Sequence, residues 1–103
     1  MIRHLLLMRF NAEISHQQLA IIQHGFESLE HSIEGVSGVE WGENNSLEGK
    51  NQGYTHSVIM NFRDETIRQA YLDHPEHTKV KALFRPYLED IVVFDYSPQG
   101  DVE

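Results

Sequence analysis

The 103-residue chain contains no cysteine, and this absence removes several kinds of chemistry at once. Disulfide bonds, thiolate metal sites and a cysteine nucleophile are all excluded. Long hydrophobic runs are missing as well, because the apolar segment 5–8 is flanked by Arg3, His4 and Arg9. That segment is far shorter than the roughly 18 residues that a membrane-spanning helix needs, and no signal-peptide cleavage pattern follows it. We therefore expect a soluble, cytoplasmic protein with no membrane partner.

Positive charge is also scarce: eight Lys and Arg stand against sixteen Asp and Glu, for a formal net charge of -8. Because the phosphate backbone would be repelled, nucleic acid is not an expected partner. Hydrophobic residues make up 40% of the chain and aromatic residues 10%, which is sufficient for a packed core. The length suits one domain.

Hydrophobic periodicity predicts elements in the order βαββαβ. A capping box at Ser15 and Gln18 begins the first helix, and Pro75 ends the second helix and opens a further helical piece. The order indicates an α+β fold, a ferredoxin-like unit with a four-stranded antiparallel sheet. It predicts a domain over 1–98 and a polar tail over 99–103. The predicted strands are 2–10, 36–44, 54–62 and 91–96, and the predicted helices are 15–33, 64–74 and a piece from 75 onward.

The predicted helices can cover only one face of this sheet, although the strands carry apolar residues on both faces. Leu5, Leu7, Ile59 and Trp41 are candidates for the uncovered face. Such a face would be an exposed apolar patch unless a second subunit covers it. The pattern therefore predicts a homodimer that associates through the open sheet face.

Several short segments resemble the stress-responsive A/B barrel (Dabb) domain family. They are His4, the Gly-Tyr-Thr-His segment 53–56, the segment 71–77 with its His-Pro-x-His element, and the Phe-Asp-Tyr segment 94–96. The resemblance covers nearly the whole chain. It implies a ferredoxin-like protomer that pairs sheet to sheet as a dimeric α/β barrel.

The same segments are similar to those of a plant polyketide cyclase in this family, which closes a linear polyketide by intramolecular aldol condensation. The resemblance implies a catalytic histidine at His77, a partner histidine at His4, a third pocket histidine at His56 and a pocket tyrosine at Tyr71. A second pocket tyrosine of the cyclase corresponds to Phe26, so the same substrate does not follow. His56 and Phe26 are the expected substrate-binding residues.

Acid–base catalysis needs a base and a donor, and the predicted site offers both. His77 is the candidate base, with Asp95 on the last strand as the carboxylate that orients it. His4 or Tyr71 would donate a hydrogen bond to the oxyanion or enolate that forms. These four residues are the candidate catalytic group.

A purely structural interpretation of the same residues remains open. His74 and His77 would then bond to backbone groups freed at the helix break around Pro75, and Tyr71 would be a core residue with its hydroxyl at a wet edge. A histidine on an apolar face, such as His4, is commonly a hydrogen-bonded core residue. The histidines show no dedicated metal-ligand spacing, so neither a metal nor a cofactor is predicted. His16, His24 and His31 are expected to face solvent.

Two functional hypotheses of different classes follow. The first is a dimeric barrel that binds a small hydrophobic carbonyl compound and performs cyclase, lyase or isomerase chemistry on it. The second is a non-enzymatic stress-response or structural protein in which the histidines serve packing. A third hypothesis, heme-degrading monooxygenase activity, rests only on analogy with related barrel folds.

Overall fold

The elements of the protein, in a computed structural model that describes residues 1–100, follow the predicted order βαββαβ. The second helical region consists of two pieces, as expected from Pro75. The predicted tail falls partly outside the described residues, which end at Gly100. The strands are β1 (Ile2–Phe10), β2 (Val36–Glu43), β3 (His56–Phe62) and β4 (Leu88–Tyr96), and the helices are α1 (His16–Ser32), α2 (Glu65–Leu72) and α3 (Pro75–Phe84), with a 3-10 turn η1 (Arg85–Tyr87) after α3.

Side-chain caps fix where the helices begin. The Ser15 hydroxyl accepts a hydrogen bond from the Gln18 backbone N–H, and the Gln18 side chain accepts one from the Ser15 N–H, which confirms the predicted capping box. The Asp64 carboxylate accepts a hydrogen bond from the Ile67 N–H at the start of α2. The helices therefore start at positions that the local sequence determines.

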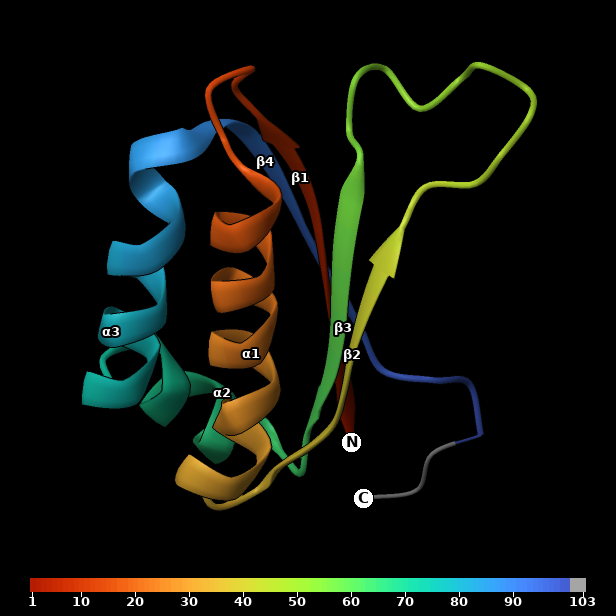
Figure 1. Ribbon diagram of the computed structural model, residues 1–103. Coiled ribbons are helices and arrows are strands. Elements are labelled where there is room, and N and C mark those ends of the chain that lie inside the picture. Colours follow the sequence, from red (N-terminus) through yellow and green to blue (C-terminus); the bar gives the residue numbers. More distant parts are fainter. Residues whose placement is uncertain (101–103) are drawn as a thin grey trace.

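The four strands form one antiparallel sheet in the order β2-β3-β1-β4, and the three helices lie on one of its faces (Figure 1). β1 is central, with His4 opposite Met60 of β3 and opposite Asp95 of β4. Strand alternation turns His4 and Met60 toward the helices, where the core lies. The fully buried members of the core include Met8, Ile22, Phe26, Leu29, Val58, Met60, Phe62 and Tyr71.

No helix covers the second sheet face in the described part of the chain (Figure 1). Leu5 lies on this open face opposite Ile59 and Phe94, as the sequence predicts for Leu5 and Ile59. Leu7 is 40% exposed and Phe94 59% exposed. Apolar side chains thus run across the three strands β3, β1 and β4 and remain in contact with solvent.

The prediction that Trp41 belongs to this open face is wrong. Trp41 lies opposite Val58, a residue that is fully buried beneath the helices. Its ring centroid is 6.3 Å from that of Phe26 on α1. Trp41 therefore belongs to the helix side, because a bulge in β2 at positive-φ Gly38 changes the alternation between Ser37 and Glu40.

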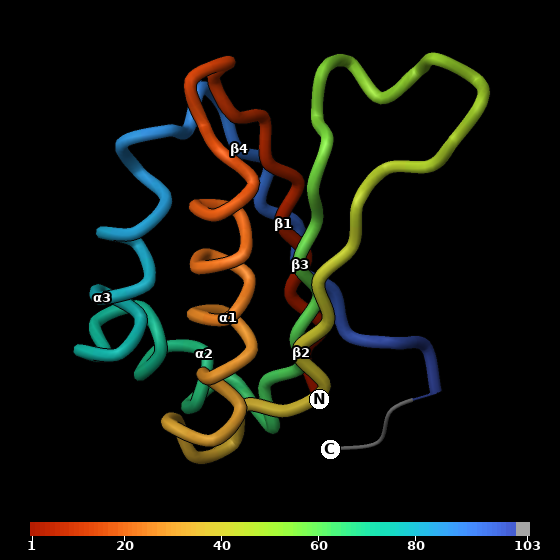
Figure 2. The backbone as a smooth tube through the Cα atoms, in the orientation of Figure 1, coloured from red at the N-terminus to blue at the C-terminus, as the bar shows by residue number. Residues whose placement is uncertain are grey.

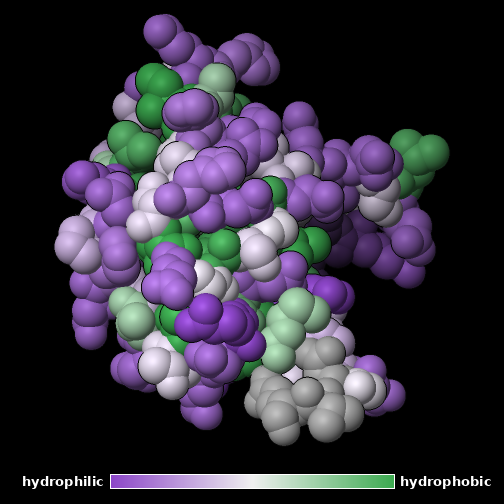
Figure 3. Space-filling model, turned by 90° about the horizontal axis from the view of Figure 1, so that it is seen from below, coloured by the Kyte–Doolittle hydropathy of each residue, from purple (hydrophilic) through white to green (hydrophobic). Residues whose placement is uncertain are grey.

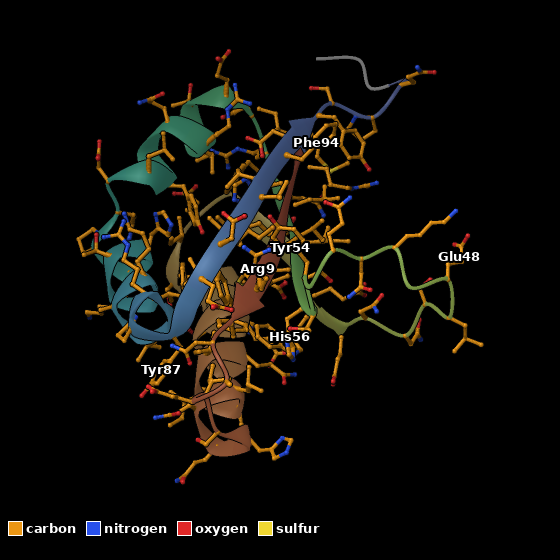
Figure 4. All side chains as sticks on the ribbon, turned by 90° about the horizontal axis from the view of Figure 1, so that it is seen from above. Arg9, Glu48, Tyr54, His56, Tyr87 and Phe94 are labelled. Carbon is orange, nitrogen blue, oxygen red and sulfur yellow. The ribbon has the colours of Figure 1, made fainter. Side chains whose placement is uncertain are left out.

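The connection between β2 and β3, residues 44–55, is a long loop that projects beyond the sheet (Figure 2). Figure 4 shows Glu48 at the far end of this loop and Tyr54 beside Arg9 at its base. The Tyr54 hydroxyl donates a hydrogen bond of 2.5 Å to the Asp90 carboxylate, and the Arg9 guanidinium lies 5.4 Å from the Tyr54 ring centroid. These contacts attach the base of the loop to β1 and β4.

Seen from below, the surface is largely hydrophilic, with smaller hydrophobic areas between the polar side chains (Figure 3). His16, His24 and His31 are exposed on α1, as predicted. Within residues 1–100, no helix is long and apolar enough to span a membrane.

Replacement of Gly35 by alanine tests the junction between α1, α2 and β2. Gly35 has φ +84°, and a Cβ there would lie 2.6 Å from Cγ1 of Ile67. We expect Gly35→Ala to lower the free energy of unfolding by roughly 2–4 kcal/mol, through both backbone strain and overpacking. Gly49→Ala is the matched control, because Gly49 has φ +69° with open space around it. This variant should lower the free energy of unfolding by only about 1 kcal/mol. Equal losses in chemical denaturation would contradict the close packing at Gly35.

Candidate functional site

A cavity of about 260 Å³ lies between the helix layer and the sheet, beside α3 and β4. Its wall contains four of the residues singled out from the sequence: His4, Phe26, Tyr71 and His77. The remainder of the wall is mainly apolar. Leu6, Leu72, Lys81, Phe84, Arg85, Leu88, Ile91 and Val93 complete the lining. The cavity is open to solvent along β4, since Val93 is 56% exposed.

His4 is buried in β1, at 7% exposure, and is held by the strand next to it. Its Nδ1 lies 2.6 Å from Oδ1 of Asp95, which stands directly opposite on β4. The other carboxylate oxygen of Asp95 is 3.6 Å from the Arg68 guanidinium on α2. Because an ionised carboxylate only accepts hydrogen bonds, Asp95 places the proton of His4 on Nδ1 and leaves Nε2 as the second functional nitrogen.

His77 lies in the first turn of α3 and is held by the end of α2. Its Nδ1–H donates a hydrogen bond of 3.0 Å to the backbone carbonyl of Tyr71. The two rings stack with centroids 3.9 Å apart and planes 23° apart. Because a carbonyl can only accept, the bond fixes the tautomer, and Nε2 carries the lone pair of the neutral ring.

The electrostatic environment of His77 favours its neutral form. Burial lowers the pKa of the imidazole below its ordinary value of 6.5, and the nearby Lys81 ammonium lowers it further. Hydrogen bonds to the backbone oppose these effects only in part. His77 is therefore an unprotonated imidazole near neutral pH, the form that can accept a proton.

The helix α3, which carries His77, is capped at its N-terminus by a second histidine, His74. The Nδ1 of His74 accepts a hydrogen bond of 3.1 Å from the Glu76 backbone N–H, and Pro75 follows at the first position of α3. His74 and His77 thus both bond to backbone groups at the break, as the structural interpretation predicts. For His77, however, this bond uses one ring nitrogen only, and the ring also forms part of the cavity wall.

Tyr71 lines the same cavity, and its hydroxyl is buried. The residue is 1% exposed, and no partner for its hydroxyl exists among residues 1–100. Burial, together with the charge of Asp95, raises the pKa of the phenol far above its ordinary value of 10.0. Tyr71 therefore remains protonated and offers a hydrogen-bond donor. An unsatisfied buried hydroxyl is unfavourable unless a ligand or water completes it.

The predicted pairing of Asp95 with His77 is wrong, because Asp95 is hydrogen-bonded to His4 and the His77 Nδ1 is bonded to the backbone. Asp95 thus acts on the other histidine of the cavity. The local sequence places Asp95 on a strand but does not show that β4 pairs with β1 in the register that brings it beside His4.

The structure also places His56 away from this cavity. His56 pairs with Met8, four residues along β1 from His4, which corresponds to roughly 13 Å. Its ring contacts Phe10 and Trp41, and burial lowers its pKa. His56 instead lines a separate hollow of about 510 Å³ beside the 44–55 loop. The predicted contribution of His56 to the same pocket is therefore not found.

Two cations at the cavity were not identified as site residues from the sequence. Lys81 and Arg85 both line it. They follow His77 at intervals of four residues, a spacing that places side chains on one side of a helix. This four-residue spacing is the feature of the sequence that could have placed Lys81 and Arg85 beside His77. In the described portion of the chain, no group of three or more His, Asp or Glu side chains is arranged to hold a metal ion.

Comparison with known proteins shows the family of this chain. The sequence profile of the Stress responsive A/B Barrel Domain family matches residues 2–98. Olivetolic acid cyclase of Cannabis sativa is 30% identical over 98 residues, which cover 95% of this chain and 97% of the cyclase. The stress-response A/B barrel domain-containing protein HS1 of Arabidopsis thaliana is 30% identical over 97 residues, covering 94% of this chain and 89% of that protein.

Solved structures show the same architecture. A dimeric ferredoxin-like protein of unknown function from Thermobifida fusca superposes with a TM-score of 0.81 at 27% identity. The match covers 94% of this chain and 90% of that protein. The ferredoxin-like fold predicted from the order of elements is thus confirmed, and it occurs in this relative as a dimer.

The pKa of His77 provides a direct test of this site. In an NMR titration, His77 should titrate below 6.5, and Lys81→Gln should raise its pKa because a nearby positive charge is removed. The unfolded chain binds this proton more readily, so the free energy of unfolding should fall as the pH drops below about 6.5 through the folded pKa.

Lys79→Gln is the matched control for this titration. Lys79 is on the same helix, but its side chain is 72% exposed and is paired with Glu76 at 3.0 Å. Its replacement should leave the His77 pKa nearly unchanged. A wild-type His77 that titrates at or above 6.5 would contradict the described environment.

Proposed function

Because this chain belongs to the stress responsive A/B barrel domain family, we propose that it binds a small hydrophobic carbonyl compound in the cavity beside α3. We further propose acid–base chemistry of the cyclase, lyase or isomerase type on this compound. The observation that carries the proposal is that Tyr71, whose buried hydroxyl has no partner among residues 1–100, and neutral His77 line the same mainly apolar cavity.

Each polar side chain has a distinct role in this proposal. The lone pair on Nε2 of His77 acts as the base. The Tyr71 hydroxyl donates a hydrogen bond to the carbonyl oxygen of the ligand, and its raised pKa keeps the proton on the donor. His4 supplies a second polar group, held in orientation by Asp95. Phe26 forms part of the apolar wall.

The common first step is removal of a proton from the carbon next to the carbonyl. His77 Nε2 takes the proton and becomes an imidazolium, and the C–H electron pair forms the C=C bond of an enolate. The electron pair of the C=O bond moves to the oxygen, where the Tyr71 hydroxyl stabilises the charge. Return of the proton to carbon regenerates the neutral base. Whether ring closure, elimination or isomerisation follows depends on the substrate.

The family relationship supports a catalytic role of this kind. Olivetolic acid cyclase, the 30% identical relative, is named for a cyclase activity and aligns over nearly its full length. The lining nevertheless has its own composition, with Phe26 where the sequence resemblance implies a tyrosine. We therefore propose a shared type of chemistry and a different ligand.

The second candidate function is a non-enzymatic stress-response or structural role. The observation that favours it is that His74 and His77 both bond to backbone groups at the helix break. In this case, His77 would hold α3 against α2 and would have no reaction to catalyse. The two candidates differ in whether the protein accelerates proton removal from a ketone.

Exchange of hydrogen for deuterium at the carbons next to the carbonyl of 2-octanone distinguishes these candidates. The reaction is followed by NMR in D₂O and needs no knowledge of the natural substrate. We expect the wild-type protein to accelerate the exchange and His77→Ala to reduce the acceleration by about 100-fold or more, since the base is lost. Tyr71→Phe should retain the base but slow the exchange by about tenfold or more, because the donor to the enolate oxygen is lost.

His31→Ala is the control for this experiment, because His31 is an exposed histidine in the last turn of α1. This variant should accelerate hydrogen–deuterium exchange in the ketone at the wild-type rate. Circular dichroism and melting temperature verify that each variant is folded. Exchange by His77→Ala at the wild-type rate, or no acceleration by the wild type over free imidazole, would exclude the proposed chemistry.

We also propose that the protein is a homodimer formed through the open sheet face. The supporting observations are the uncovered apolar side chains on β1, β3 and β4 and the dimeric state of the Thermobifida fusca relative. Figure 4 shows Phe94 on the side of the sheet that faces away from α2 and α3. Contact between two such faces would remove these side chains from water.

Phe94→Glu should convert this dimer to a monomer, because dimerisation would bury an unpaired charge on the apolar face. Sedimentation velocity measures the change as a halving of molecular mass. Ile21→Glu is the matched control: Ile21 is 49% exposed on α1, in the helix layer, and its replacement should leave the dimer intact. A wild-type protein that sediments as a monomer at micromolar concentration would contradict the proposal.

A further inference from the structure

The cavity beside α3 carries two positive charges that have no negative partner within residues 1–100. Both Lys81 and Arg85 line the cavity. Arg9, Arg63, Arg68, Lys79 and His4 form ion pairs with carboxylates, whereas Lys81 and Arg85 form none with another residue in the range 1–100. No Asp or Glu is among the lining residues that the structure describes. This part of the surface is therefore locally cationic in a chain whose formal net charge is -8.

The three basic side chains follow one another along the cavity. His77, Lys81 and Arg85 are separated by four residues each, so they occupy one side of α3 and of the turn that continues it. With a rise of 1.5 Å per residue, Lys81 lies about 6 Å and Arg85 about 12 Å beyond His77 along this axis. Tyr71 and His77 thus mark one end of the cavity, and the two cations extend toward the other.

This arrangement is unfavourable in the empty protein. The Lys81 ammonium lowers the pKa of His77, which is itself a residue of the cavity wall. Lys81 is half-buried, so solvent screens its charge less than that of an exposed lysine. An anion placed between Lys81 and Arg85 would be attracted by both cations and would offset their mutual repulsion.

We infer that the ligand of this cavity is an amphipathic keto acid, whose carbonyl lies at Tyr71 and His77 and whose carboxylate lies between Lys81 and Arg85. The inference rests on the proposed function and specifies the substrate class of that site. The apolar wall formed by Leu6, Phe84 and Ile91 holds the chain between the two polar groups. A carbonyl and a carboxylate about six bonds apart match the spacing of His77 and the two cations along α3.

A matched pair of ligands tests this assignment. 7-Oxooctanoate and 7-oxooctanamide have the same chain and the same ketone and nearly the same shape, but only the first carries a negative charge. The dissociation constants of both ligands are measured by NMR titration of the full-length protein, at low and at high salt. The variants Lys81→Gln and Arg85→Gln remove the two charges one at a time. Lys79→Gln, a charge removal outside the cavity on the same helix, is the control.

We expect the wild-type protein to bind the carboxylate about tenfold more tightly than the amide. Each of Lys81→Gln and Arg85→Gln should weaken carboxylate binding by about three- to tenfold and leave amide binding unchanged. High salt should reduce the preference in the wild type, because salt screens the charges. Lys79→Gln should retain the wild-type preference.

Other outcomes would contradict the assignment. Equal affinities for the two ligands, or a carboxylate preference that survives both charge removals, would overturn the keto acid assignment while the proposed ketone site stands. Failure of both ligands to saturate the wild-type cavity would overturn the assignment together with the proposed function. Melting temperatures establish that each variant is folded before its affinity is interpreted.

Discussion

The hydrogen bond from His77 Nδ1 to the Tyr71 carbonyl is the contact on which the candidate site depends. It joins α2 to α3 across the break at Pro75. The same bond stacks the two rings and fixes the tautomer of His77. The structural role of this imidazole uses Nδ1, whereas the proposed chemical role would use Nε2. This is why bonding to the backbone does not by itself assign His77 to packing.

One-sided coverage of the sheet separates the molecule into two surfaces with different properties. On the helix side, the core closes over most of the sheet but leaves a cavity at the edge strand β4. On the other side, Leu7 and Phe94 remain exposed. Since side chains alternate along a strand, neighbouring residues of β1 serve opposite surfaces: His4 faces the cavity and Leu5 faces the open side. Substitutions that alter the cavity can therefore leave the open face unchanged, and the reverse also holds.

Local signals predicted most of the fold. The errors came from the pairing of distant strands and, for Trp41, from the bulge at Gly38 in β2. The capping box at Ser15 and the break at Pro75 depend on residues close in sequence, so the elements could be placed without a structure. The partner of Asp95 depends instead on the register between β1 and β4, which lie at opposite ends of the chain. For His56, alternation predicted the correct face but could not show its distance from His4 along the strand. Alternation therefore predicted the sheet face of a residue where the strand is regular, as for His4 and His56, but not beyond the bulge, as for Trp41, and it did not predict neighbours on adjacent strands.

The unpartnered hydroxyl of Tyr71 links binding to folding stability. Burial of a donor without an acceptor destabilises the empty protein by roughly 1–3 kcal/mol, relative to the same ring without the hydroxyl. That energy is recovered only when an acceptor enters the cavity. The core thus contains a polar group that no other described residue satisfies. Occupancy of the cavity would accordingly protect the whole domain against unfolding, by the usual thermodynamic linkage between ligand and native state.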